Sequence, residues 1–85
     1  MDSLEQATQE LMRKTMRDIQ VETAYVWAYR SQAARKLADK ARLAGALADA
    51  GAWAMDAQEY EHEALEHAAL AGDNVLSAVR LIVSA

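Results

Sequence analysis

The sequence predicts an all-α protein, an antiparallel hairpin of two helices that forms a single domain over residues 1–85. Three observations lead to this prediction. Proline is absent and glycine occurs three times in 85 residues, while alanine is abundant and β-branched residues are sparse, which is typical of helices. Apolar residues recur at three- and four-residue intervals in both halves of the chain. Between the halves, Gly45 and Gly51 weaken helix formation, so the turn is expected near residues 49–55.

The first expected helix is long and carries one apolar face. Placing residues at about 100° per position puts a set of apolar and threonine side chains on that face. These are Leu4, Thr8, Leu11, Met12, Thr15, Ile19, Val26, Tyr29, Ala33, Leu37, Ala44 and Leu47. The opposite face is polar and includes Arg17, Ser31 and Arg35. The apolar face is therefore expected to pack against the second helix.

The second helix is expected to run from residue 57 toward the C-terminus. Asp56 is a suitable N-cap, Glu59 completes a capping box, and Met55 is placed to pack on Tyr60 as a hydrophobic staple. The apolar side of this helix holds Ala57, Ala64, Leu65, Ala68, Gly72, Val75, Leu76, Val79, Ile82 and Val83. Small residues on this side allow the two backbones to approach closely. The favoured prediction is one continuous helix, with a kink or break at residues 72–74 as the alternative, since Gly72 is able to end a helix.

The apolar faces are too wide for a hairpin alone. Trp27 lies about 160° around the first helix from Tyr29, and Leu70 falls among acidic residues on the outer side of the second helix. At 85 residues the chain is also near the size at which one core is marginal. A partner chain is therefore expected to cover part of the surface.

Composition excludes several kinds of function. There is no cysteine, so disulfides, thiolate metal sites and thiol nucleophiles are ruled out. A net charge of -4, with no basic stripe, argues against nucleic-acid binding. Neither a targeting signal nor a segment fit to span a bilayer is evident, so a cytoplasmic protein without membrane contact is expected. No phosphate loop or nucleophile motif occurs, and we expect a non-enzyme without a cofactor.

One stretch suggests a metal site. Glu59 and His62 have the Glu-x-x-His spacing of carboxylate-bridged di-iron proteins. With Glu22, which lies in the first helix one heptad before Tyr29, they would resemble a ferritin-like half-bundle completed by dimerisation. Glu59 and His62 project away from the apolar side, however, whereas di-iron ligands point into a bundle. The first prediction is therefore that Glu59 and His62 belong to a polar surface without a metal. An iron-binding half-bundle is the alternative.

The second half of the chain also resembles a known family. The segment "DAQEYEHEALEHAALAGDNVLSAVRLI" is similar to the second helix of the YscE-like co-chaperones of type III secretion needle subunits. The positions that carry the resemblance are Asp56 for the cap, Tyr60 for the aromatic residue, Ala69 and Leu70 for the mid-helix pair, and Val75, Leu76 and Val79 for the aliphatic cluster. Family members are short, cysteine-poor helical hairpins. The long first helix, with its tyrosines and Trp27, departs from the family pattern.

This resemblance implies a function in protein binding. Such a co-chaperone binds a larger tetratricopeptide-like chaperone, and the pair keeps the needle subunit monomeric in the bacterial cytoplasm before export. Apolar side chains at coiled-coil-like spacing would supply the contacts. The residues expected to bind a partner are Val26, Trp27, Tyr29, Leu70, Leu76, Val79 and Ile82. A homodimer of the isolated chain and a self-associating helical structural protein remain alternatives.

Overall fold

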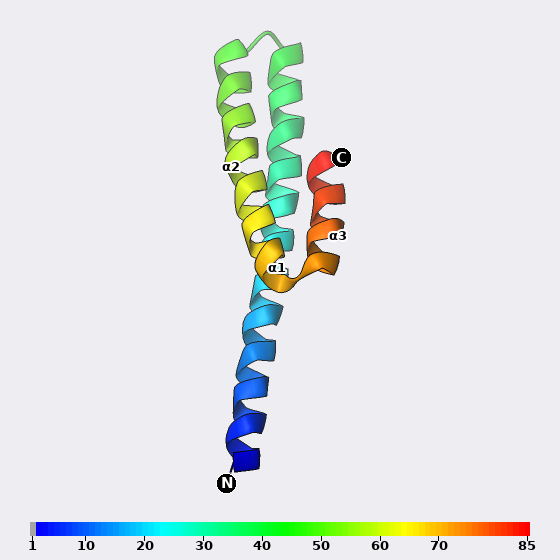
Figure 1. Cartoon of the computed structure of the whole chain (residues 1–85). Coiled ribbons are helices and arrows are strands. Elements are labelled where there is room, and N and C mark those ends of the chain that lie inside the picture. The colour runs from blue at the N-terminus through cyan, green and yellow to red at the C-terminus, as the bar shows by residue number, and fades with distance from the viewer. Residues whose placement is uncertain (1) are drawn as a thin grey trace.

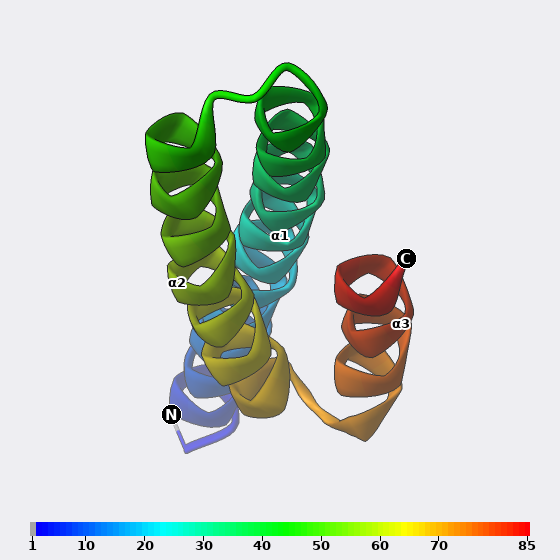
Figure 2. The same cartoon turned by 90° about the horizontal axis from the view of Figure 1, so that it is seen from above.

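The computed structural model describes the backbone of residues 2–85 and the side chains of residues 3–85. These residues form three α-helices and no strand: α1 (Asp2–Leu43), α2 (Leu47–Ala71) and α3 (Asp73–Ser84). Helix α2 runs antiparallel to α1, and α3 turns back beside α1 (Figures 1 and 2). The all-helical prediction and the α1–α2 hairpin are confirmed, but the two-helix prediction is wrong because a third helix follows. The molecule measures 66 × 18 × 12 Å.

The hairpin turn lies earlier than predicted, at residues 44–46 instead of 49–55. Gly45 has a φ of 79°, the left-handed conformation that glycine adopts without a Cβ penalty. The Gly45 N–H donates to the Arg42 carbonyl at 3.0 Å, and the Ala46 N–H donates to the Ala41 carbonyl at 2.9 Å. This pair of bonds is a Schellman motif, which satisfies the free carbonyl groups at the end of α1.

The predicted helix start at Asp56 is also wrong. Helix α2 begins at Leu47, so Asp56 and Glu59 lie within the helix rather than in a capping box. Met55 is largely exposed. Half of residues 46–55 are alanine, the strongest helix former, and Gly51 costs a helix interior only about 1 kcal/mol. The helix therefore continues through Gly51, where a reversal was predicted.

Gly72 breaks the second half of the chain into two helices, so the favoured continuous helix is wrong and the alternative break is confirmed. Gly72 has φ 125° and ψ 168°, a combination essentially restricted to glycine. Its N–H donates to the Ala68 carbonyl at 3.1 Å, and its carbonyl accepts the first bond of α3 from Leu76 at 3.0 Å. No side-chain hydrogen bond caps α3, so the glycine backbone makes the reversal without help from Asp73.

The core is built largely from alanine. Small residues spaced by seven lie buried on both long helices: Ala24, Ser31 and Ala38 on α1, and Ala57, Ala64 and Ala71 on α2. This spacing keeps one face of each helix toward the other, as in a coiled coil. Buried Ser31 accepts a hydrogen bond from Arg35 at 3.3 Å. We call these six residues, together with Ala28, Ala34 and Ala68, the alanine seam.

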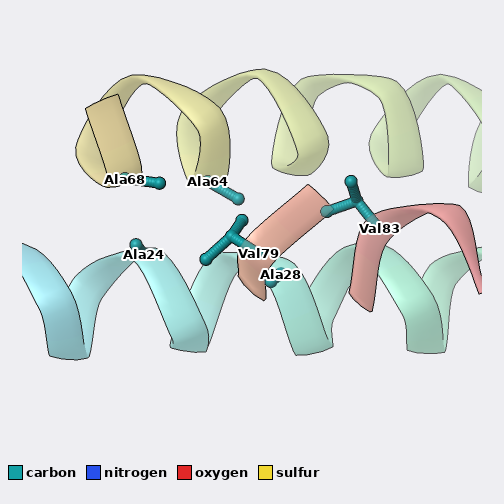
Figure 3. Packing of buried hydrophobic residues seen from close by; sticks show 6 residues of the cluster. All are labelled: Ala24, Ala28, Ala64, Ala68, Val79 and Val83. Carbon is teal, nitrogen blue, oxygen red and sulfur yellow. The ribbon is translucent and has the colours of Figure 1, made fainter. Parts of the chain in front are cut away.

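Helix α3 supplies the largest buried side chains. Val79 is fully buried and Val83 nearly so, and both pack against Ala24, Ala28, Ala64 and Ala68. Figure 3 shows the two valines between the ribbons of α1 and α2. Val75, Leu76 and Ile82 are partly buried against this cluster. The short third helix thus fills the space along the edge of the alanine seam.

Candidate protein-interaction surface

Seven large apolar residues of α1 lie on the face opposite the alanine seam. We call them the outer stripe: Leu4, Leu11, Met12, Ile19, Val26, Tyr29 and Leu37. Their side chains are between 41% and 72% exposed. The prediction that this face packs in the hairpin is therefore wrong, because the smaller residues on the other side occupy that interface. A row of exposed large apolar side chains on one face is a common mark of a surface that binds another molecule.

The outer stripe has two parts. Its upper part, with Val26, Tyr29 and Leu37, lies on the portion of α1 whose inner face is covered by α2 and α3. Its lower part lies on the N-terminal arm, residues 2–19, which projects beyond the other helices (Figure 1). Residues 3–19 are all exposed. A lone helix of this length is only marginally stable in water, so the arm gains stability when another chain covers its apolar face.

Polar bonds fix the lower end of α2 on α1. The Arg17 Nε donates to the Ala71 carbonyl across 3.1 Å, and so places a positive charge at the negative end of the α2 dipole. His67 Nδ1 donates to the Gln20 Oε1, while its Nε2 lies 3.6 Å from Glu63 Oε2. His67 is thus a link between helices, a role that its acidic sequence surroundings did not suggest.

The residues predicted to bind a partner fall into two groups. Val26, Tyr29 and Leu70 are exposed, Leu70 by 71%. Val79 is fully buried in the chain's own core, and Leu76 and Ile82 are partly buried against that core. Trp27 is also partly buried. The structure therefore brings the first group to the surface and uses the second group largely for internal packing.

Trp27 and Tyr60 form one wall of an open groove. Their ring centroids lie 5.4 Å apart with the planes inclined at 39°, and the Arg30 guanidinium sits 4.9 Å from the Trp27 ring centroid, within cation–π range. The groove has a volume of about 620 Å³. It is lined by Trp27, Gln58, Glu59, Tyr60, His62 and Glu63. Its polar lining is acidic, and its aromatic wall is already packed by the chain's own side chains.

The proposed iron ligands do not form a cluster. Among residues 3–85, no group of three or more His, Asp or Glu side chains is close enough to hold a metal ion. Glu22 is exposed on α1, and Glu59 and His62 are exposed on α2. The imidazole of His62 lies 3.0 Å from its neighbour Glu66 on the same helix. Within a single chain, these side chains make local surface contacts rather than a metal centre.

No helix in the described part of the chain is both long and apolar enough to cross a bilayer. Comparisons with protein-family models, with curated proteins and with solved structures gave no match to this chain.

Proposed function

We propose that the chain is a non-catalytic interaction module whose upper outer stripe binds a helical segment of a larger protein. The observation that carries this proposal is the exposure of Val26, Tyr29 and Leu37 on a helix whose inner face is already occupied. Intervals of three and eight residues place these apolar anchors on one face of α1, which suits a helix laid along it. Tyrosine is also among the residues that most often dominate the free energy of binding at an interface.

The more specific form of the proposal is a cytoplasmic co-chaperone of a type III secretion needle subunit. It rests on the resemblance of the second half of the chain. Leu70, at the mid-helix position of that resemblance, is exposed and available to a partner. Asp56, which the resemblance matches to a helix cap, lies instead inside α2. The larger partner would be a tetratricopeptide-like chaperone, and the pair would hold the needle subunit as a monomer before export.

Co-expression tests this function directly. The tagged chain would be produced together with the tetratricopeptide-like chaperone and the needle subunit of its own host. The molar mass of the purified complex would then be measured by light scattering. We expect a stable complex that Tyr29→Asp weakens about 100-fold or more, because the change buries a charge at the interface. Leu81→Asp is the matched control, since Leu81 is 76% exposed on α3 and lies outside the stripe.

Two results would count against the proposal. Failure of the chaperone and needle subunit to bind would contradict the co-chaperone role. Equal binding by the Tyr29→Asp variant and the wild type would show that the upper stripe is not the docking surface.

A further inference from the structure

The chain exposes more surface than a protein of its mass normally does. Its accessible area is 6291 Å², whereas a compact monomer of 9.3 kDa is expected to expose about 5,000 Å². The excess of about 1,300 Å² is larger than the roughly 800 Å² that each partner contributes to a standard protein interface. Much of it belongs to the N-terminal arm, where residues 3–19 are all exposed. The arm therefore has enough free surface for a stable interface of its own.

Six side chains on the outer-stripe face of the arm follow a palindromic order. The first three, from residue 4 to residue 11, are a large apolar residue, a threonine and a large apolar residue. The next three, from residue 12 to residue 19, repeat these classes in reverse order. The matching positions are Leu4 with Ile19, Thr8 with Thr15, and Leu11 with Met12. In a two-fold symmetric interface residue i of one copy meets residue j of the other, and j meets i. A palindromic stripe on a straight helix satisfies this condition when a second copy lies antiparallel to it.

The centre of the pair also has room for side chains of the second copy. Met16 lies about 90° around the helix from the middle of the stripe, at the flank of this centre. A hollow of about 280 Å³ lies at this place, lined by Leu11, Met12, Thr15 and Met16. Apolar side chains of a second arm are of suitable size to fill it, as knobs enter holes in a coiled coil.

The charges disfavour the parallel alternative. Glu22 lies on the same face as the stripe and is exposed. Parallel pairing in register would set the two Glu22 carboxylates against each other, which is unfavourable. In the palindromic register Glu22 lies past Ser3 of the other copy and stays in water.

From these observations we propose that the N-terminal arm pairs with the arm of a second copy of this chain. The pair is an antiparallel, two-fold symmetric coil centred between Leu11 and Met12. The α2 and α3 helices of each copy lie beyond opposite ends of the coil, on the faces away from the outer stripe. The upper stripe, with Val26, Tyr29 and Leu37, is left free in both copies.

Sedimentation equilibrium of the purified full chain tests the pairing. We expect a dimer at micromolar concentration and a dissociation constant raised about 100-fold or more by Leu11→Asp, because each dimer would then hold two charges at its centre. Leu81→Asp, outside the arm, is the control and should leave the dissociation constant unchanged. A monomeric wild type, or a Leu11→Asp variant that dimerises normally, would overturn the proposal.

Disulfide formation between introduced cysteines tests whether the two arms pair antiparallel. The chain has no cysteine of its own, so every disulfide joins introduced residues. Chains carrying Thr8→Cys and Thr15→Cys, distinguished by a tag on one, would be mixed and oxidised. Antiparallel pairing predicts mostly the mixed disulfide, since two copies of either cysteine would be offset by about 10 Å along the axis, too far for a bridge. Predominance of the two unmixed products would demonstrate a parallel pair and overturn the proposed geometry.

This inference is independent of the proposed function. Tyr29→Asp removes binding at the upper stripe but leaves the arm dimer intact, whereas Leu11→Asp removes the dimer. Loss of both properties in either single variant would contradict the assignment of two separate surfaces.

Discussion

The two faces of α1 differ in a way that hydrophobicity alone does not explain. The inner face, built from Ala24, Ala28 and similar small residues, is buried, while the outer face carries leucine, methionine and tyrosine and is exposed. A ranking by side-chain hydrophobicity would assign them in the opposite order. The difference shows that in this chain backbone proximity decides which face pairs within the molecule, because only small side chains let two helices approach closely.

The division also separates two uses of apolar residues. The alanine seam and the α3 valines hold one chain together, whereas the side chains of the outer stripe are 41–72% exposed and contribute less to its packing. Substitutions on the two faces should therefore differ sharply in their effect on the free energy of unfolding. The following changes test that difference, from the largest expected effect to the smallest.

Val79→Asp should have the largest effect. Val79 is fully buried between α1 and α2, and an unpaired carboxylate there costs about 4 kcal/mol or more. This is a large part of the stability of a small domain, so we expect the circular dichroism signal of the folded chain to be lost. Tyr29→Asp on the outer face is the control and should remain folded; equal unfolding of both variants would refute the assignment of the two faces.

Ala64→Leu should also destabilise the chain, despite adding apolar area. Ala64 is fully buried in the alanine seam, and enlarging it forces α1 and α2 apart at a cost of about 1–3 kcal/mol. Ala33→Leu makes the same change at an exposed position of α1 and should alter the free energy of unfolding little. Urea denaturation of both variants measures the free energy of unfolding. An Ala64→Leu variant as stable as wild type would show that the seam has space for a larger side chain.

Arg17→Gln should have a moderate effect. The change removes the charge that meets the Ala71 carbonyl at the end of α2, and bonds of this kind contribute about 1 kcal/mol, somewhat more when charged. Arg13, one turn earlier on the exposed arm, provides the matched control Arg13→Gln. Thermal melts of the two variants should differ, and if they coincide the Arg17 contact contributes nothing to stability.

Val26→Ser should leave the stability of the single chain within about 0.5 kcal/mol of wild type, as for most exposed positions. Its side chain is half exposed on the outer stripe, so little area returns to water when the chain unfolds. Binding of the helical partner should weaken instead. A loss of several kcal/mol in denaturant unfolding would show that the outer stripe packs within the chain after all.

Some of this architecture was accessible from the sequence. Composition predicted the helices, and Gly72 marked a possible break that the structure confirms. The turn was misplaced because Asp56 and Glu59 have the chemistry of a helix start, yet the same residues are tolerated within a helix flanked by alanine. The presence of Gly45 predicted only that a helix is less stable there. Its role at the end of α1 depends on a backbone angle that the sequence does not encode by itself.

The choice of the packed face was the larger error, and a signal for the correct one was present. Ala24, Ser31 and Ala38 repeat every seven residues, as do Ala57, Ala64 and Ala71. Hydrophobic periodicity placed Ala57 and Ala64 correctly on the packed side of the second helix. On the first helix it gave Ala24, Ser31 and Ala38 little weight because alanine and serine rank low in hydrophobicity. Val26, Tyr29 and Leu70 are exposed. That they bind a partner remains a prediction, and the identity of the partner rests on the resemblance alone.

The alanine seam also has a calorimetric consequence. The heat capacity change of unfolding rises with the apolar area that becomes hydrated, typically by about 12–15 cal/mol/K per residue. A core of methyl groups with two large valines exposes less such area than a core of leucine and phenylalanine. The heat capacity change per residue should therefore be small, and the free energy of unfolding should vary with temperature along an unusually flat curve.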